Sequence, residues 1–175
     1  PRVAAPTTAH KRAIAPQPIV KPELPHGGPA ILARTKLREM ASRQIQVEER
    51  QQLAAAIEQQ QLPGVDMEVF FAYDSSAIAP QAYQSLAALG QALADPRLAG
   101  QTFLIAGHTD ITGSAYYNQS LSDRRAWSVK SFLVQNFGID PNALIAVGYG
   151  EEQLKDIYNP TSGINRRVQV VALAN

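Results

Sequence analysis

The residues best placed to do chemistry lie in one stretch, residues 103–129. It begins with four apolar residues, Phe103 to Ala106, a length and composition that suit a buried strand. A polar turn containing Asp110 follows. The remainder has a helical pattern in which Arg125 shares a face with apolar residues. A strand that delivers an acid, followed by a helix that turns an arginine inward, predicts a functional site.

Arg125 is the unusual residue of this pattern. A charge on the inward face of a helix costs free energy unless it is paired and hydrogen-bonded. Asp110, just upstream, is the expected partner. One interpretation is a structural ion pair. The other is a site for a ligand with both an ammonium and a carboxylate, in which Asp110 takes the amine and the planar fork of Arg125 takes the carboxylate.

The same stretch resembles a known family. Residues 107–129, GHTDITGSAYYNQSLSDRRAWSV, are similar to the signature of the OmpA-like peptidoglycan-binding domain, shared by outer-membrane protein A, the peptidoglycan-associated lipoprotein and the flagellar stator protein MotB. Three further segments resemble the family in order and spacing: residues 67–75, MEVFFAYDS; 147–151, VGYGE; and 165–168, NRRV. The resemblance covers roughly residues 65–173. The chain departs from the family in having no proline soon after Glu151.

The resemblance implies an α/β (α+β) sandwich of βαβαβ type, with a mixed four-stranded sheet and helices packed on it. It implies non-enzymatic, non-covalent binding of peptidoglycan through the diaminopimelate residue of the stem peptide. It also implies a periplasmic place in a Gram-negative envelope, where the chain anchors an outer-membrane component to the cell wall. Asp110 and Arg125 become the main ligand contacts. The supporting positions are Thr109, Asn118, Leu121, Asp74 and Arg166, and the pocket walls are Phe71 and Tyr73.

Composition limits the function classes. The chain has 175 residues, 45% of them hydrophobic, with a net charge of +1 and no cysteine. This balance gives no reason to expect nucleic-acid binding, and the absence of cysteine excludes disulfides and thiol chemistry. No apolar run reaches the roughly 18 residues of a membrane span. Because the chain starts at Pro1 without a leader, we expect a processed or truncated product tethered to the outer membrane or to an envelope protein.

The chain is expected to have three parts. Residues 1–29 hold seven of the twelve prolines and predict an extended linker, either an inert spacer or a basic contact with an acidic surface. Residues 30–63 predict a helical extension, as two helices or one long helix with a break around residues 47–49. Its apolar faces predict packing or self-association. Residues 64–175 form the family-like domain.

The domain shows alternating strand and helix patterns. Strands are expected at residues 67–73, 101–107, 143–148 and 168–173, and helices at 80–94 and 115–137.

Other chemistries find weaker support. His108 lacks partners for a zinc site and is expected to be a turn residue satisfied by the backbone, so no metal or cofactor is predicted. Asp74 and Asp110 both follow strand ends, and a peptidoglycan-cleaving enzyme built on this pair is the enzymatic alternative. Against it, Arg125 would lower the pKa of a neighbouring acid, which disfavours a general acid. A third alternative is an interaction module that acts through the helical extension.

Overall fold

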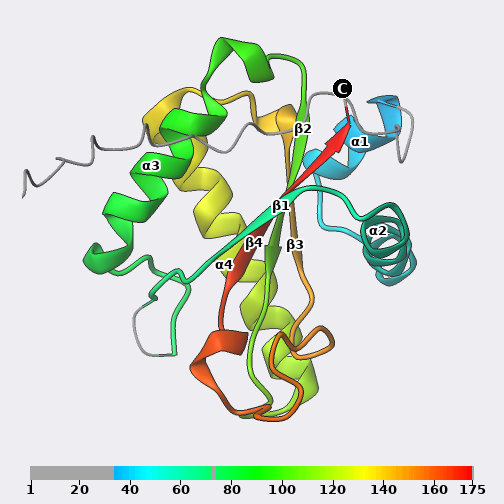
Figure 1. Cartoon of the computed structure of the whole chain (residues 1–175), viewed down its shortest axis with the longest axis vertical. Helices are drawn as coiled ribbons and strands as arrows, with labels where there is room; N and C mark the ends of the chain where they lie inside the picture. Colours follow the sequence, from blue (N-terminus) through cyan, green and yellow to red (C-terminus); the bar gives the residue numbers. More distant parts are fainter. Residues whose placement is uncertain (1–33, 72–73, 175) are drawn as a thin grey trace, which may run out of the picture.

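The structure, a computed structural model, describes residues 34–71 and 74–174. A mixed four-stranded sheet forms its centre, with helices on both faces (Figure 1). The strands are β1 (Gly64–Met67), β2 (Thr102–Gly107), β3 (Leu144–Gly148) and β4 (Val168–Ala174), in the order β1-β4-β2-β3. Only β2 and β3 are parallel; β4 runs antiparallel to β1 and β2. The mixed sheet expected from the sequence is confirmed.

The parallel pair fixes where a site can form. β2 and β3 are joined through helix α4 (Ala115–Phe137), and both strands are covered on their two faces, which explains their unbroken apolar sequences. Their register places Gly107 opposite Gly148. The segments that follow these two glycines therefore start side by side at one edge of the sheet.

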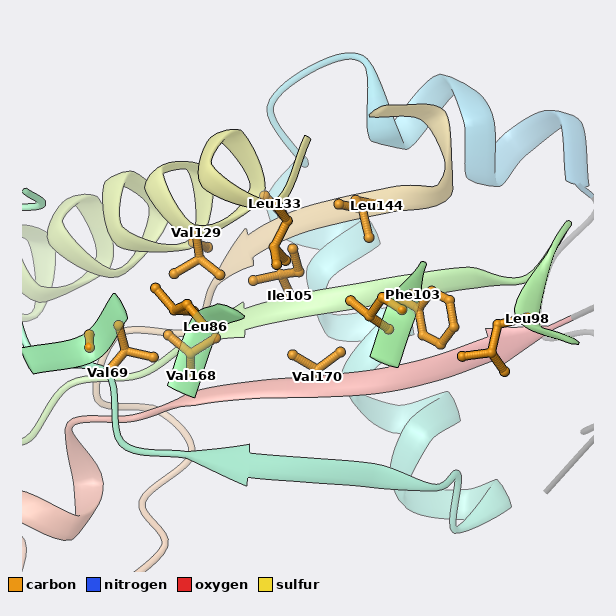
Figure 2. Close-up of a cluster of buried hydrophobic side chains, with 14 residues drawn as sticks. Val69, Leu86, Leu98, Phe103, Ile105, Val129, Leu133, Leu144, Val168 and Val170 are labelled. Atoms are coloured by element: carbon orange, nitrogen blue, oxygen red, sulfur yellow. The ribbon is translucent and has the colours of Figure 1, made fainter. Parts of the chain in front are cut away.

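One face of the sheet is covered by α4 and by α3 (Tyr83–Leu93), which follows a single turn of 3₁₀ helix at Pro80–Ala82. Figure 2 shows the core between these two helices and the sheet, where Leu86 and Leu133 pack near Ile105 and Val170 of the strands. Helix α4 has the predicted bounds; Ser114 accepts a hydrogen bond from the Tyr117 amide at its start, and Gly138 ends it in the left-handed region.

The opposite face is covered by the N-terminal extension. Helices α1 (Arg34–Ala41) and α2 (Val47–Gln60) form a second core with the sheet. Their fully buried side chains include Leu37 and Leu53. The two-helix alternative is thus the correct one, and of the two roles expected for the apolar faces, packing or self-association, the structure shows packing on the sheet.

The break between the two helices lies earlier than predicted. Residues 42–46 are not helical, and residues 47–49 form the first turn of α2. Glu49 explains this start, because its carboxylate accepts the backbone N–H of Gln46 and forms an ion pair with Arg43 at 2.7 Å. An acid in the first turn of a helix is favoured by the helix dipole.

A buried lysine connects helix α4, on one face of the sheet, with helix α1, on the other. The Nζ of Lys130, on α4, donates to the carbonyl oxygens of Ala41 at 2.5 Å and Leu144 at 2.8 Å. Lys130 is 4% exposed, and burial lowers the pKa of its ammonium. The end of α1 is therefore fastened to the start of β3.

The first strand lies earlier than expected. A strand over residues 67–73 was predicted, but β1 spans Gly64–Met67 and shares only Met67 with that range; Met67 pairs with Val168, the first residue of β4. Beyond this point the ladder has no partner, because the chain before Val168 turns into a 3₁₀ helix at Gly163–Asn165. Phe71 instead forms an isolated bridge with Ile78.

In the part of the chain that the structure describes, none of the helices combines the length and apolar character needed to cross a membrane. The proposed linker, residues 1–29, lies outside the described residues, as does Tyr73.

Candidate ligand-binding site

The start of α4 lies unusually close to the ends of β2 and β3. A Cβ atom on Gly148 would overlap the Asp123 amide and the Ser122 hydroxyl, and one on Gly107 would overlap the Ser122 carbonyl oxygen. Only glycine allows this approach. The helix thus holds its first three turns against the residues that follow the two strands.

Polar side chains of α4 fix this contact. The Asp123 carboxylate accepts the amide of Gly148 at 2.6 Å, and the Ser122 hydroxyl accepts the amide of Gly150 at 2.9 Å. Gln119 donates to the Gly148 carbonyl at 2.8 Å. The backbone around the candidate site is therefore held by hydrogen bonds from one helix.

Asp110 lies at the centre of the site. Its Oδ1 accepts the amide of Thr112 at 2.9 Å, and its Oδ2 pairs with Arg166 at 2.5 Å. Burial would raise the pKa of this carboxyl, but the hydrogen bonds from Arg166 and Thr112 outweigh it, and the net pKa is lowered. Asp110 is a carboxylate at neutral pH.

Arg125 does not form the predicted ion pair with Asp110. Its Nε donates to the Ser75 carbonyl at 3.2 Å, and its guanidinium carbon lies 4.7 Å from the centre of the Phe71 ring. Arg166 takes the expected place of Arg125, because the turn before β4 brings it across to the carboxylate.

The charge of Arg125 is thus left for another partner. Among the described residues, no carboxylate lies within ion-pair distance of it. Burial, followed by the nearby positive charge of Arg166, lowers the pKa of its guanidinium, while Asp110 raises it. Arginine stays protonated in proteins, so a half-buried cation here would gain from an incoming anion.

Asn118 connects three parts of the site. Its side-chain amide donates to the Asp110 carbonyl oxygen at 3.2 Å and to the Glu151 carboxylate at 2.6 Å. Glu151, the last residue of the VGYGE segment, was not among the predicted site residues. It lies 33 residues from Asn118 in the sequence, and no periodic pattern predicts a contact between them.

Two neighbouring residues hold buried polar atoms without partners. Within the described residues, the Thr109 hydroxyl and both ring nitrogens of His108 make no hydrogen bond. The prediction that His108 is satisfied by the backbone is therefore wrong for its ring, which stacks on Tyr149 at 5.6 Å, although its amide donates to the Arg167 carbonyl. Burial, then the charge of Arg167, lowers the pKa of His108 to about 3.

The remaining predicted residues surround this centre. Asp74 has a positive φ of 48°. It accepts a hydrogen bond from the hydroxyl of Tyr117, which was not among the predicted site residues. Leu121 is buried, and the Arg166 side chain is 52% exposed. Asp110 thus contacts both Arg166 and Asn118 directly. Phe71 packs against the guanidinium of Arg125.

This arrangement can recognise a zwitterion. A carboxylate has about four acceptor positions, so Asp110 keeps capacity for an ammonium beside its two present partners. Arg125 offers N–H groups to a carboxylate. The Arg166 side chain, which pairs with Asp110, is half-exposed and lies on the solvent side of that carboxylate.

Comparison with known proteins agrees with this fold. The sequence model of the OmpA family matches residues 70–167. The chain is 36% identical over 111 residues to outer membrane porin F of Pseudomonas fluorescens, covering 62% of this chain and 33% of that protein. It is 39% identical over 84 residues to the peptidoglycan-associated lipoprotein of Pseudomonas aeruginosa, covering 48% of each.

Among solved structures, the cell wall anchor of the T6SS from Pseudomonas aeruginosa has the same fold. It superposes with a TM-score of 0.51 at 24% identity, over 70% of this chain and 94% of that one. The chain spans about a third to a half of the curated relatives it matches. The match over residues 70–167 shows that this chain belongs to the OmpA family.

Proposed function

We propose that this chain binds peptidoglycan non-covalently through the diaminopimelate residue of the stem peptide. That residue ends in an amine and a carboxylate on one carbon. The amine would lie at Asp110 and the carboxylate at Arg125, with Thr109, Asn118, Arg166 and the other predicted residues around them. The observation that carries the proposal is the half-buried Arg125, which lacks a carboxylate partner in the described chain and lies beside the ionised Asp110.

The biological setting of the proposal comes from the relatives. Two of them are named as an outer membrane porin and a peptidoglycan-associated lipoprotein. We place this chain in the periplasm of a Gram-negative envelope, where it would anchor an outer-membrane component to the cell wall. A tether to the membrane or to an envelope protein belongs to the same proposal.

We assign no catalytic role to Asp74 and Asp110. Asp110 has a lowered pKa and is paired with Arg166, so it is ionised rather than poised to donate a proton. Asp74 is hydrogen-bonded to Tyr117. These partners favour a binding site over the enzymatic alternative.

Co-sedimentation with purified sacculi tests the proposal. Asp110→Asn keeps the shape of the side chain but removes its charge, and we expect it to lose binding while circular dichroism shows the same fold. Asp140→Asn is the matched control, because Asp140 is an exposed acid that precedes β3 at the opposite end of the sheet. Free diaminopimelate should compete with the wild type. Sedimentation of Asp110→Asn at the wild-type level would contradict the proposal.

A further inference from the structure

Two hollows of the surface lie along α4, outside the Asp110–Arg125 site. The first has a volume of about 630 Å³ and the second about 460 Å³. Both include Trp127 of α4 and Ser76, which lies in the segment between β1 and the 3₁₀ turn at Pro80, so they adjoin at these two residues and are described together as one groove. Both hollows are open to solvent, so they suit a ligand that lies along the surface rather than one that is enclosed.

The groove follows the helix axis. Its first half is lined mainly by Tyr116, Gln119, Ser120, Asp123, Arg124 and Trp127. Its second half continues along the same helix to Asn136. From residue 116 to residue 136 a helix rises about 30 Å, which is long enough for several sugar rings in a row. The shape therefore suits a linear polymer.

The lining residues suit an uncharged, hydroxyl-rich ligand. Among the described residues, Asp123 and Arg124 are the charged residues that line the first half, where their charges balance, and the second half is lined by uncharged residues. The other polar groups are hydroxyls and side-chain amides, among them Ser120, Ser131 and Gln135. Such groups pair with sugar hydroxyl and acetamido groups without requiring a charge.

Aromatic side chains complete this chemistry. Tyr116 is 87% exposed and lines the first half, and Trp127 lies where the halves meet. The ring faces of tyrosine and tryptophan provide apolar area with a polar tip, on which the C–H faces of a sugar ring can stack. Trp127 is half-buried with the Lys130 Nζ 4.9 Å from its ring centre, so the exposed ring of Tyr116 is the main surface for such stacking. Tyr116 belongs to neither hydrophobic core of the described residues, and its side chain is almost wholly in solvent.

The groove adjoins the candidate site through two consecutive residues. Ser75 accepts the Nε hydrogen bond of Arg125, and Ser76 lines both halves of the groove. We propose that the groove binds the glycan strand of peptidoglycan while its stem peptide occupies the Asp110–Arg125 site. This inference rests on the proposed function and adds a second contact with the same polymer.

Calorimetric titration with two probes tests the inference. One probe is the free stem tripeptide that ends in diaminopimelate, and the other is the same tripeptide attached to its N-acetylated disaccharide. We expect the wild type to bind the second probe more tightly. Tyr116→Ala should weaken the disaccharide probe by about 3–10-fold and leave the affinity for the free tripeptide unchanged.

Tyr158→Ala is the matched control. Tyr158 is 89% exposed, like Tyr116, but does not line the groove, so its replacement should leave both affinities unchanged. Equal wild-type affinity for the two probes, or an equal loss of both in Tyr116→Ala, would overturn the glycan groove and leave the peptide site intact. Failure of the wild type to bind the free tripeptide would instead contradict the proposed function, and this inference with it.

Discussion

Arg125 is held in place by groups that leave its charge unneutralised. The Ser75 carbonyl fixes Nε, and the Phe71 ring lies against the guanidinium. A cation over an aromatic face is stabilised by about 0.5–2 kcal/mol, less than a desolvated ion pair would give. These two contacts hold Arg125 in place before a ligand binds. We propose that its remaining N–H groups provide most of the affinity for the ligand carboxylate.

His108 makes the stability of the domain sensitive to acid. Its pKa is about 3 in the folded protein instead of 6.5, so below about pH 6.5 the unfolded chain binds a proton that the folded chain does not. The free energy of unfolding should fall as the pH is lowered through this range. His108→Phe keeps a ring to stack on Tyr149 and removes the titration.

Urea unfolding at pH 7 and pH 4.5 measures this effect. Between these values the wild type should lose about 2 kcal/mol more than His108→Phe. His10 and His26 are common to both proteins, so the difference isolates His108. The carboxylates with lowered pKa values contribute mainly below this window. An equal loss in both proteins would show that His108 is not buried in its neutral form.

The sequence could identify some residues of the site and not their partners. Asp110 and Arg125 stood out because an acid after a buried strand and an arginine on an apolar helix face are both unusual. The Arg166–Asp110 pair joins residues 56 apart in the sequence, and no periodicity connects them. The orphaned polar atoms of Thr109 and His108 likewise depend on what the fold places around them.

At the scale of elements, the site depends on how closely α4 approaches β3. Gly148→Ala would push a Cβ against the Asp123 amide and the Ser122 hydroxyl. We expect a loss of roughly 1–3 kcal/mol in stability from this overpacking, together with weaker ligand binding because the start of α4 must shift.

Gly100→Ala provides the comparison. Gly100 has a φ of 84° and open space around its Cβ position, so alanine there costs only backbone strain of about 1 kcal/mol. Melting curves and sacculus binding should be measured for both variants. We expect Gly100→Ala to bind sacculi normally, and normal binding by Gly148→Ala would contradict the positioning role of this contact.

Most elements were predicted within a residue or two, including the strands β2, β3 and β4, and the first strand is the exception. Helix α4 has a long apolar stripe, a serine before its start and a glycine after its end, and its bounds were predicted correctly. β1 lies at Gly64–Met67, before most of the predicted range 67–73, because its partner β4 begins only at Val168, and no local pattern in the sequence reveals that pairing.

The N-terminal helices α1 and α2 cover one face of the sheet. Leu104, Ile145 and Val171 are 0% exposed under α1 and α2. Exposing each such side chain costs about 1.5–3 kcal/mol, and a domain is stable by only about 5–15 kcal/mol. We therefore propose that the folding unit begins before residue 64 and includes both helices.

Two truncated chains test this proposal. A chain of residues 34–175 should melt cooperatively and bind sacculi, whereas one of residues 63–175 should aggregate or melt at a much lower temperature. Equal melting temperatures for the two chains would show that the extension is dispensable for folding.

In the proposed site, Arg125 recognises a carboxylate with its planar fork. The most direct measurement is the affinity of the stem tripeptide for Arg125→Lys, determined with its melting temperature on the same sample. Losing a bidentate contact in a partly dry site should cost on the order of 2–5 kcal/mol, a loss of more than tenfold. Arg124→Lys, on the exposed side of the same helix turn, should stay within about twofold of the wild type. Binding by Arg125→Lys within that same margin would contradict the account.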